Sequence, residues 1–518
     1  MKYAISGDIK ISKVLEYDVV IVGAGIAGLY AALNLDKSLS CLVLAKESVD
    51  TSNSWLAQAG IAAAISGDDD PEFHLEDTVV AGAGLSDVEA VKILASEGPS
   101  DIRNLVSLGV PFDFDEDGEL DLTIEGGHNK RRVVHAGGDA TGRETVLSLA
   151  GIAARYDNIS SRGNSCLFDI LTNSSGVLGV VIRSSTGNFH LVKSRNVIIA
   201  TGGAGQVYKS TTNPSVATGD GIAAAARAGA ILKDIEFIQF HPTGLWSADG
   251  EGRKFLISES LRGEGAMLVN HAGERFMVDN HPRAELAPRD IVARGIVKEM
   301  KSGGTQHVFL DITSKSEEYL RERFPTIWNE CLKHGINIAH DKIPVHPVQH
   351  YLMGGIKTDL NGRTNIKGLY ACGEAASTGI HGANRLAANS LLECLVFGRR
   401  TAQSINESKA DMRSVNTLSP QTLPANVPVK PHNQLDYEAL RSSVQQIMDD
   451  CCGVIRKKTD LKPAAHQVEN IYKQLDAIFD ESIDYIETLN IATVAKEILE
   501  AAYQRSDSIG SHYIIEED

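Results

Sequence analysis

The stretch Y-D-V-V-I-V-G-A-G-I-A-G at residues 17–28 decides the fold of this chain. It holds a short β-branched run, three glycines in the pattern G-x-G-x-x-G and the start of a helix-like segment, and a second apolar strand is expected at Cys41–Leu44. In this pattern the first glycine permits a tight turn, the second lets the backbone approach a pyrophosphate, and the third lets helix pack on strand. The stretch predicts a dinucleotide-binding α/β unit, against the alternative of a glycine-rich structural turn.

The acidic residue that usually binds the ribose of the dinucleotide is missing. It is expected about 20 residues after the glycines. Ala45 and Lys46 stand there instead, and Glu47 comes one or two positions late. We therefore expect the ribose to be held through the backbone or through Lys46.

Two further glycine-bearing strand ends favour FAD over the shorter NAD. They are A-T-G-G-A-G, which begins at Ala200, and C-G-E-A, which begins at Cys372. A flavin dinucleotide is long and needs contacts from several distant segments, and three such segments are spread here over 350 residues. The alternative is that all three are ordinary turns between a strand and a loop.

Composition and charge narrow the class of protein. A length of 518 residues suggests roughly three domains of ordinary size. The chain is 43% hydrophobic and 23% charged, which is ordinary for a globular protein. Its formal net charge of −17 disfavours binding to nucleic acid or to an anionic membrane.

The cysteines indicate a reducing compartment, and the N-terminal residues do not resemble a secretion signal. The seven cysteines are scattered and form no C-x-x-C pair, so a disulfide framework is not expected. Met1–Lys13 has no apolar segment typical of a signal peptide. The longest uncharged apolar stretch, Val19–Leu33, has 15 residues and three glycines, which is too short to span a membrane. We expect a cytoplasmic protein.

The pattern of the chain changes several times. Short strands and turns mixed with a charged helical stretch replace the first pattern near residue 236, and the first pattern returns near residue 350. Four of the 15 prolines fall within residues 420–431, which is typical of a linker, and the residues after them have helical periodicity. We predict a first cofactor-binding part at 1–235, an inserted capping domain at 236–349, a second cofactor-binding part at 350–417, a linker at 418–432 and a helical domain at 433–518.

Several long motifs resemble the L-aspartate oxidase family within the succinate dehydrogenase/fumarate reductase flavoprotein superfamily. Besides the first glycine motif they are S-N-S-W-L-A-Q-A-G at 52–60, E-G-G-H-N-K-R-R-V-V-H at 125–135, Q-F-H-P-T-G at 239–244, L-R-G-E-G-A at 261–266, E-L-A-P-R-D-I-V-A-R at 285–294, H-Y-L-M-G-G-I at 350–356 and G-A-N-R-L-A-A-N-S-L-L-E at 382–393. The resemblance runs from Tyr17 to about Leu461. It implies an α/β fold: a Rossmann-like FAD-binding domain, an inserted α+β capping domain and a C-terminal helical domain.

The resemblance also implies the residues that bind FAD. Glu374 would bond the ribityl hydroxyls, and the helix that begins after Asn389 would point its N-terminus at the cofactor. The implied set is Gly23, Ala24, Gly25, Ile26, Ala27, Gly28, Lys46, Asn53, Ser54, Trp55, Leu56, Ala57, Gln58, Ala59, Gly60, Ala200, Thr201, Gly202, Gly203, Asp220, Glu374, Ser390 and Leu391.

Histidines and arginines beside glycine or proline form the candidate substrate site. Cations gathered on turns of an acidic protein suit a dicarboxylate, because they offer charge-assisted and bidentate hydrogen bonds. The resemblance implies that Arg289 exchanges a proton with the substrate's β-carbon, although an arginine is hard to deprotonate. It implies that His241, His350 and Arg385 bind carboxylates, that Ser258 contacts the substrate, and that Glu264 with Arg262 serves the proton path or holds the loop.

Two positions distinguish between the branches of the superfamily. Asn53 stands where the membrane-complex dehydrogenases carry the histidine that bonds covalently to FAD, so FAD should be non-covalent here. Glu125 stands where aspartate oxidases carry a glutamate that orients the α-ammonium group. A carboxylate there matches the one positive charge that succinate lacks. The alternative is that Glu125 is a loop carboxylate paired with Arg131 or Arg132.

The function implied by the resemblance is the oxidation of L-aspartate to iminosuccinate, with oxygen or fumarate as the electron acceptor. It is the first step of NAD synthesis through quinolinate, and quinolinate synthase would use the product downstream. The alternative within the superfamily is a soluble fumarate reductase or a succinate dehydrogenase flavoprotein subunit. A non-catalytic flavin-binding protein would keep the glycine turns but has no reason to keep Arg289, His241, His350 and Arg385.

Overall fold

A five-stranded parallel sheet is the centre of the molecule in the computed structural model, which describes residues 3–247, 252–409, 423 and 427–516. Its strand order is β18-β11-β2-β3-β7, and Val20 pairs with Leu42 on one side and Val197 on the other. The inner strands are buried and apolar, as a sheet covered on both faces requires. The strands are β2 (Val19–Val22), β3 (Cys41–Leu44), β7 (Ile159–Arg162), β11 (Asn196–Ile199) and β18 (Leu369–Ala371).

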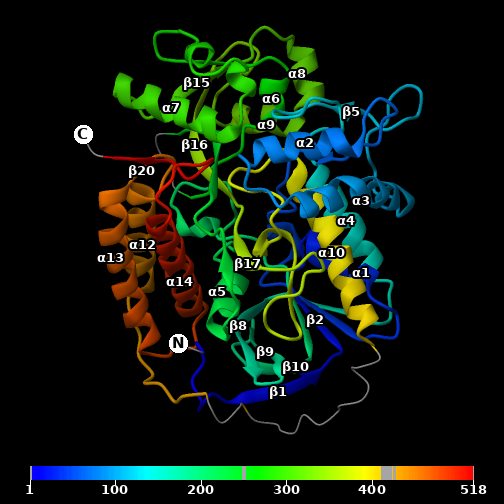
Figure 1. Ribbon diagram of the computed structural model, residues 1–518, viewed down its shortest axis with the longest axis vertical. Helices are drawn as coiled ribbons and strands as arrows, with labels where there is room; N and C mark the ends of the chain where they lie inside the picture. Colours follow the sequence, from blue (N-terminus) through cyan, green and yellow to red (C-terminus); the bar gives the residue numbers. More distant parts are fainter. Residues whose placement is uncertain (1–2, 248–251, 410–422, 424–426, 517–518) are drawn as a thin grey trace.

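Helices α1 (Ile26–Asn34) and α10 (Asn389–Glu407) pack against each other beside this sheet (Figure 1). Helix α3 (Val88–Ser107) lies against α10, and it matches the helical spacing of the apolar residues in the stretch 89–108. The turn between β2 and α1 and the start of α10 at Asn389 are likewise where the sequence predicted them. The helices α2 (Pro71–Ala81), α4 (Thr141–Ala153) and α5 (Asp220–Ala228) complete this part.

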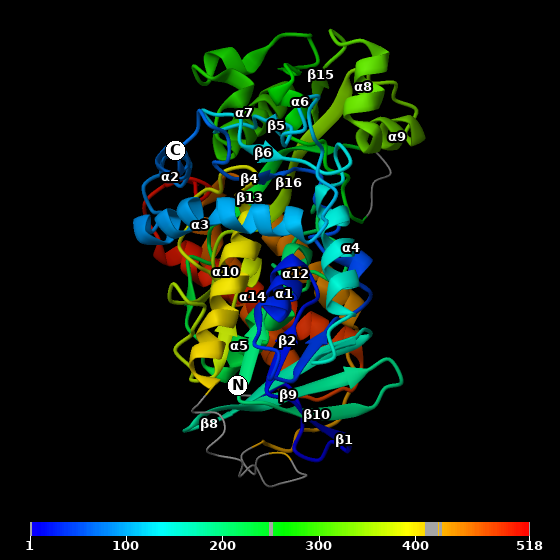
Figure 2. The ribbon, with the colours of Figure 1, turned by 90° about the vertical axis from the view of Figure 1, so that its right-hand side faces the viewer.

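A second sheet, β1-β10-β9-β8, lies at the end of the molecule opposite the capping elements (Figures 1 and 2). The apolar pattern of residues 177–181 predicts a later strand of the cofactor-binding domain, and these residues lie inside β9, which belongs to this second sheet and pairs antiparallel with its neighbours. The strands are β1 (Ile11–Glu16), β8 (Ser165–Asn173), β9 (Gly176–Ser184) and β10 (Phe189–Lys193). Shorter pairings join β4 (Ile61–Ala62), β5 (Leu122–Thr123) and β6 (Val133–Val134), and also β12 (Leu232–Lys233), β17 (Gly355–Lys357) and β19 (Ala376–Ser377).

The inserted segment folds around its own sheet, with strand order β13-β16-β15-β14, and its own apolar core. Its long strands β13 (Ile238–Leu245) and β16 (Ile343–Leu352) are paired so that His241 lies opposite Val348. Strand β16 runs without a break through residues 349 and 350. The other elements are β14 (Met267–Val269), β15 (Val308–Asp311), α6 (Ser260–Gly263), α7 (Arg289–Gly303), α8 (Glu317–Arg323) and α9 (Pro325–Lys333).

Three helices of the C-terminal part stand side by side, as the helical periodicity predicted. They are α12 (Tyr437–Cys451), α13 (Lys458–Asp476) and α14 (Ile483–Gln504). The short strand β20 (Arg456–Lys457), between α12 and α13, pairs with β21 (Ile514–Ile515), which follows α14. The last residues reach the capping helix, because Arg294 of α7 donates to the carbonyl of Gly510 at 2.7 Å. Most of the predicted linker at 418–432 lies outside the described residues.

In the part of the chain that the structure describes, none of the helices combines the length and the apolar character needed to cross a lipid bilayer.

Candidate active site

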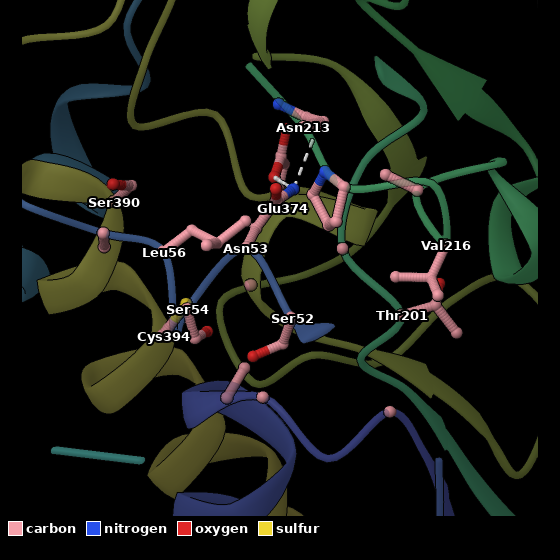
Figure 3. Close-up of a pocket in the computed structure, with 18 of the residues that line it drawn as sticks. Ser52, Asn53, Ser54, Leu56, Thr201, Asn213, Val216, Glu374, Ser390 and Cys394 are labelled. Carbon is pink, nitrogen blue, oxygen red and sulfur yellow. Dashed lines mark hydrogen bonds between the residues drawn. The ribbon is translucent and has the colours of Figure 1, made fainter. Parts of the chain in front are cut away.

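A long cavity of about 1770 Å³, including its open mouth, is lined by residues from the ends of the parallel strands to the capping segment. Figure 3 shows part of its wall. The N-terminal residues of α1, α5 and α10 contribute to its wall. Most of the residues predicted to bind cofactor or substrate line it: Gly23, Ala24, Gly25, Ala27, Lys46, Asn53, Ser54, Leu56, Ala57, Gln58, Ala59, Gly60, Ala200, Thr201, Gly202, Asp220, His241, Ser258, Arg289, His350, Glu374, Arg385, Ser390 and Leu391.

The first glycine turn leaves no room for side chains at two positions. Gly23 has φ +116°, and a Cβ there would lie 2.1 Å from the carbonyl oxygen of Ala200. A Cβ at Gly28 would lie 2.0 Å from the carbonyl oxygen of Gly23. Both glycines are therefore required by the close approach of backbone to backbone, as the motif predicts.

Four of the residues predicted to bind cofactor lie behind the cavity wall rather than on it: Ile26, Gly28, Trp55 and Gly203. Gly28 is used in packing, and a Cβ at Gly203 would lie 2.3 Å from Oε1 of Glu374. The backbone N–H of Ile26 donates to Oγ of Ser54 at 3.1 Å. These residues shape the wall because they hold the turn and its neighbours in place.

Lys46 joins three parts of the chain at one end of the cavity. Its Nζ lies 2.9 Å from Asp220 of α5 and 2.6 Å from Glu487 of α14. Burial alone would lower the pKa of Lys46, but the two carboxylates raise it above its ordinary value, so the lysine stays charged. Glu487 also pairs with Arg441 at 2.9 Å, so the network is balanced in charge.

Asn53 and Glu374 meet in the middle of the cavity (Figure 3). Nδ2 of Asn53 donates to Oδ1 of Asn213 at 3.0 Å and to Oε2 of Glu374 at 3.4 Å. The other oxygen of Glu374 accepts from the backbone N–H of Leu352 at 3.0 Å. Burial raises the pKa of Glu374 to about 7. Sequence reasoning missed Asn213, which stands in a polar loop without a motif that singles it out.

The opposite end of the cavity collects the predicted histidines and arginines, of which only the arginines are cations. The rings of His241 and His350 lie 5.2 Å apart, centroid to centroid, and the guanidinium of Arg385 lies 4.4 Å from the ring centroid of Tyr351. Burial and the neighbouring arginines hold the pKa of both histidines well below the usual range, so both rings are neutral at neutral pH. Burial and Arg289 lower the pKa of Arg385 to about 10, which still leaves it charged.

His241 presents a hydrogen-bond donor to the cavity. The backbone N–H of Thr243 donates to its Nδ1 at 3.2 Å, so Nδ1 is the acceptor and the proton of the neutral ring sits on Nε2. Nε2 is buried and has no hydrogen-bond partner among the described residues. A carboxylate oxygen in the cavity would satisfy it.

Arg289 is held by two residues that sequence reasoning did not select. Its Nε donates to Oε2 of Glu259 at 2.6 Å, and its Nη1 donates to Oε1 of Gln239 at 2.9 Å. Arg262 lies 3.2 Å from the other oxygen of Glu259. Burial would raise the pKa of Glu259, but Arg262 and Arg289 hold it below its ordinary value. The i,i+3 spacing of Glu259 and Arg262 in the sequence could have indicated an ion pair between them.

Glu264, predicted to serve the proton path or hold the loop, is not at the cavity. It is partly exposed, and its carboxylate lies 3.8 Å from Lys315 and 4.0 Å from Arg323. Helix α6 ends at Gly263, before Glu264, which turns it away from the buried face that carries Glu259 and Arg262. The carboxylate that contacts both arginines is therefore Glu259.

Glu125 is a buried carboxylate beside this cluster. It is 2% exposed, and neither of its oxygens has a hydrogen-bond partner among the described residues. Burial and the charge of Glu259 raise the pKa of Glu125 to about 7. The alternative pairing is wrong, since Arg132 pairs with Asp69 and Asp77 and Nε of Arg131 donates to the carbonyl of Leu122. Glu125 does not itself line the cavity, but it feels the charges of Arg289 and Arg385, which do.

The cavity fits a flavin dinucleotide. The glycine turn and the helix N-termini offer backbone N–H groups and a favourable dipole to a pyrophosphate. Oε1 of Gln58 and Oγ1 of Thr201 on the wall are buried without a partner, and Glu374 offers a carboxyl group. These groups match the polar positions that a long dinucleotide needs along its length.

Comparison with known proteins places the chain in a family. The FAD binding domain model matches residues 18–391, and the model of the fumarate reductase flavoprotein C-terminus matches residues 441–517. The chain is similar to a quinol fumarate reductase from E. coli, with a TM-score of 0.90, 30% identity and coverage of 97% of this chain and 92% of that one.

Curated relatives point to one branch of this superfamily. An L-aspartate oxidase of Streptomyces coelicolor is 44% identical over 96% of this chain and 88% of that protein. An L-aspartate oxidase of Neisseria meningitidis is 43% identical over 96% of this chain and 98% of that protein. The chain therefore belongs to the L-aspartate oxidase family of the succinate dehydrogenase and fumarate reductase flavoproteins, and its cofactor is FAD.

Proposed function

We propose that this enzyme oxidises L-aspartate to iminosuccinate, with the α-hydrogen leaving as a hydride to FAD. The observation that carries the proposal is Glu125, a buried carboxylate without a hydrogen-bond partner among the described residues, which lies just behind the cavity wall near Arg289 and Arg385. A dicarboxylate without an amine gives this carboxylate no partner, whereas the α-ammonium group of L-aspartate does. The similarity to curated L-aspartate oxidases supports the same substrate.

The substrate carboxylates are assigned to the cationic end of the cavity. Nε2 of His241 donates one hydrogen bond, and Arg385 and His350 lie on the same wall. Ser258 adds a hydroxyl group. Arg385 is the charged member of the set, since both rings are neutral at neutral pH, and its planar guanidinium can bind a carboxylate through two bonds.

Glu125 is assigned two roles toward the α-amino group of L-aspartate. Its ionised form pairs with the α-ammonium group and so selects L-aspartate. Because a positively charged amine resists loss of hydride from the adjacent carbon, the ammonium group must first lose a proton. A carboxylate with a pKa of about 7 is suited to accept that proton near neutral pH.

Arg289 is assigned to the branch of the reaction that uses fumarate. FAD supplies the two-electron chemistry when it is bound. Reduction of fumarate to succinate needs a hydride on one carbon and a proton on the other, and Arg289, which lines the cavity, is placed to donate that proton. The chain Arg262–Glu259–Arg289 leads inward and would return a proton to it. Oxygen, reduced to hydrogen peroxide, is the alternative acceptor.

FAD is proposed to be non-covalent, because the Asn53 amide cannot form the bond that a histidine forms in the membrane-complex dehydrogenases. The product is an imine, which hydrolyses in water, so an enzyme that uses it directly is expected downstream. Quinolinate synthase, in the synthesis of NAD, is the proposed consumer.

The test is a product balance on the purified FAD-loaded enzyme. With L-aspartate and oxygen we expect one hydrogen peroxide for each oxaloacetate and ammonia that hydrolysis of the imine releases. With L-aspartate and fumarate under anaerobic conditions we expect one succinate for each oxaloacetate and ammonia released. Release of fumarate from succinate, with no ammonia from L-aspartate, would instead support the succinate dehydrogenase branch.

A further inference from the structure

We infer that Thr212 is a positioning residue: it fixes His350 as the tautomer that carries its proton on Nε2, through a chain of hydrogen bonds that begins at Asn53. The inference rests on the proposed function, because it concerns how the substrate's carboxylate is bound. Thr212 is outside every motif that pointed to the site.

The directions of the hydrogen bonds follow from the groups along the chain. Nδ2 of Asn53 donates to Oδ1 of Asn213 at 3.0 Å (Figure 3). Nδ2 of Asn213 therefore faces the other way, and it donates to the carbonyl of His350 at 2.8 Å and to Oγ1 of Thr212 at 3.5 Å. Oγ1 of Thr212 lies 2.8 Å from Nδ1 of His350. Among the described residues, Nδ1 of His350 is the acceptor within hydrogen-bond distance of this hydroxyl, so the proton of Thr212 is directed to Nδ1 and the oxygen accepts from Asn213.

The backbone holds Thr212 in this position. The N–H of Thr212 donates to the carbonyl of Gln349 at 3.0 Å, and the N–H of Gln349 donates to the carbonyl of Ser210 at 2.9 Å. Thr211 and Gln349 also form a parallel bridge. The loop is thus tied to strand β16 one residue before His350, and the threonine side chain has little freedom to leave the ring.

The tautomer decides whether His350 attracts or repels a carboxylate. Its ring lines the cavity beside Arg385, and burial and the arginines keep it neutral at neutral pH. A neutral ring has one donor and one acceptor nitrogen. With Nδ1 occupied by the Thr212 hydroxyl, Nε2 carries the proton and donates. The opposite tautomer would present a lone pair to the substrate's oxygen.

His241 offers a built-in comparison. Its tautomer is set by a backbone N–H, that of Thr243, which no side-chain substitution removes. At His350 side chains set the tautomer, and the chain starts from Asn53 and Glu374 in the middle of the cavity. Asn53 therefore does more than leave FAD without a covalent bond, because its amide also orients the amide of Asn213.

The test compares Thr212→Val, which has the same shape but no hydroxyl, with Thr212→Ser, which keeps the hydroxyl. In the FAD-loaded enzyme we expect the valine variant to raise the KM for L-aspartate and the Kd of succinate, read from the flavin absorbance, by about tenfold, the size of one lost hydrogen bond to a charged group. We expect kcat to change less than about threefold, because the substitution acts on binding rather than on the reacting atoms. We expect the serine variant to stay within about twofold of the parent and the FAD Kd of both to be unchanged.

A second measurement reads the tautomer directly. In the ¹⁵N-histidine-labelled enzyme the two ring nitrogens of His350 should show a protonated Nε2 in the parent and in Thr212→Ser, and a mixture of tautomers in Thr212→Val. An unchanged pattern in the valine variant, or equal losses in the serine and valine variants, would overturn the inference. Succinate binding needs no oxidation. If Thr212→Val weakens succinate binding but the parent enzyme does not oxidise L-aspartate, the proposed function is rejected and the role of Thr212 is kept.

Discussion

Arg289 and Glu259 form a buried ion pair in which Nε of the arginine lies 2.6 Å from Oε2 of the glutamate. Arg262 approaches the other carboxylate oxygen at 3.2 Å, so one negative charge stands between two arginines. An arginine holds its proton tightly in water, and a proton that it gives away must be replaced. In the proposed fumarate reaction, Glu259 and Arg262 are the groups that would return the proton to Arg289.

Replacing the bridging carboxylate should therefore slow the fumarate reaction most. For Glu259→Gln we expect fumarate-dependent turnover to fall by about 100-fold or more, the usual contribution of a positioned acid–base group. Steady-state rates with L-aspartate as donor and either fumarate or oxygen as acceptor measure this.

Glu264→Gln is the matched control for that variant. Its carboxylate lies away from the cavity, beside Lys315 and Arg323. We expect its rates to stay within about twofold of the parent, as is usual for a partly exposed group with long ion pairs. Equal losses in the two variants would contradict the assignment of Glu259.

Binding of L-aspartate should strengthen as the pH rises through neutrality. The pKa of Glu125 is raised to about 7, so its carboxylate is mostly protonated at pH 6 and mostly ionised at pH 8. Only the ionised form pairs with the α-ammonium group. We expect the Kd of L-aspartate, read under conditions that prevent turnover, to fall by severalfold across this range, as the charge of one group predicts.

Glu125→Gln should abolish the pH dependence of L-aspartate binding and should affect the binding of L-aspartate and of succinate differently. The amide keeps the size of the side chain but loses the charge. We expect L-aspartate to bind about tenfold or more weakly at pH 8, and succinate to bind no more weakly than in the parent. Glu374 also titrates near neutrality, but it would affect both ligands alike. A common loss for both ligands would contradict the role of Glu125.

Acid precipitation should release all of the flavin. Asn53 stands at the position of covalent attachment in the membrane-complex dehydrogenases, and its amide is already engaged with Asn213 and Glu374. After denaturation and centrifugation we expect the yellow colour in the supernatant and none in the pellet. Flavin that remains with the precipitated protein would show a covalent bond elsewhere.

Lys46→Met should weaken FAD binding and leave the rest of the fold in place. The substitution leaves Asp220 and Glu487 as two buried negative charges at the cavity wall without their shared cation. We expect the FAD Kd, measured by quenching of flavin fluorescence, to rise by about tenfold or more, the scale of a broken buried pair. With saturating FAD, kcat should change little, because Lys46 lies away from the substrate end.

The cofactor end of the site could be predicted from the sequence because its chemistry is local. The glycines at 23 and 28 must be glycines for steric reasons that act within one turn, and the strand before them and the helix after them are visible in the residue pattern. The position of the residues at 177–181 in a second, antiparallel sheet depends on pairings between distant strands and was not visible.

The substrate end was only partly predictable, because its geometry depends on contacts across the capping segment. Glu264 and Glu259 both flank the arginine of one short motif, and only the ending of helix α6 decides which of them faces Arg289. Thr212 and Asn213 reach His350 because their loop pairs with β16, far along the chain. No spacing within the sequence indicates such a contact.

The most direct test of the account is an anaerobic titration of the FAD-loaded enzyme, followed through the visible absorbance of the flavin. L-aspartate is added to one sample and succinate to another. L-aspartate should bleach the flavin rapidly, and succinate should bind without bleaching it. Bleaching by succinate alone, or by neither ligand, would contradict the proposed function.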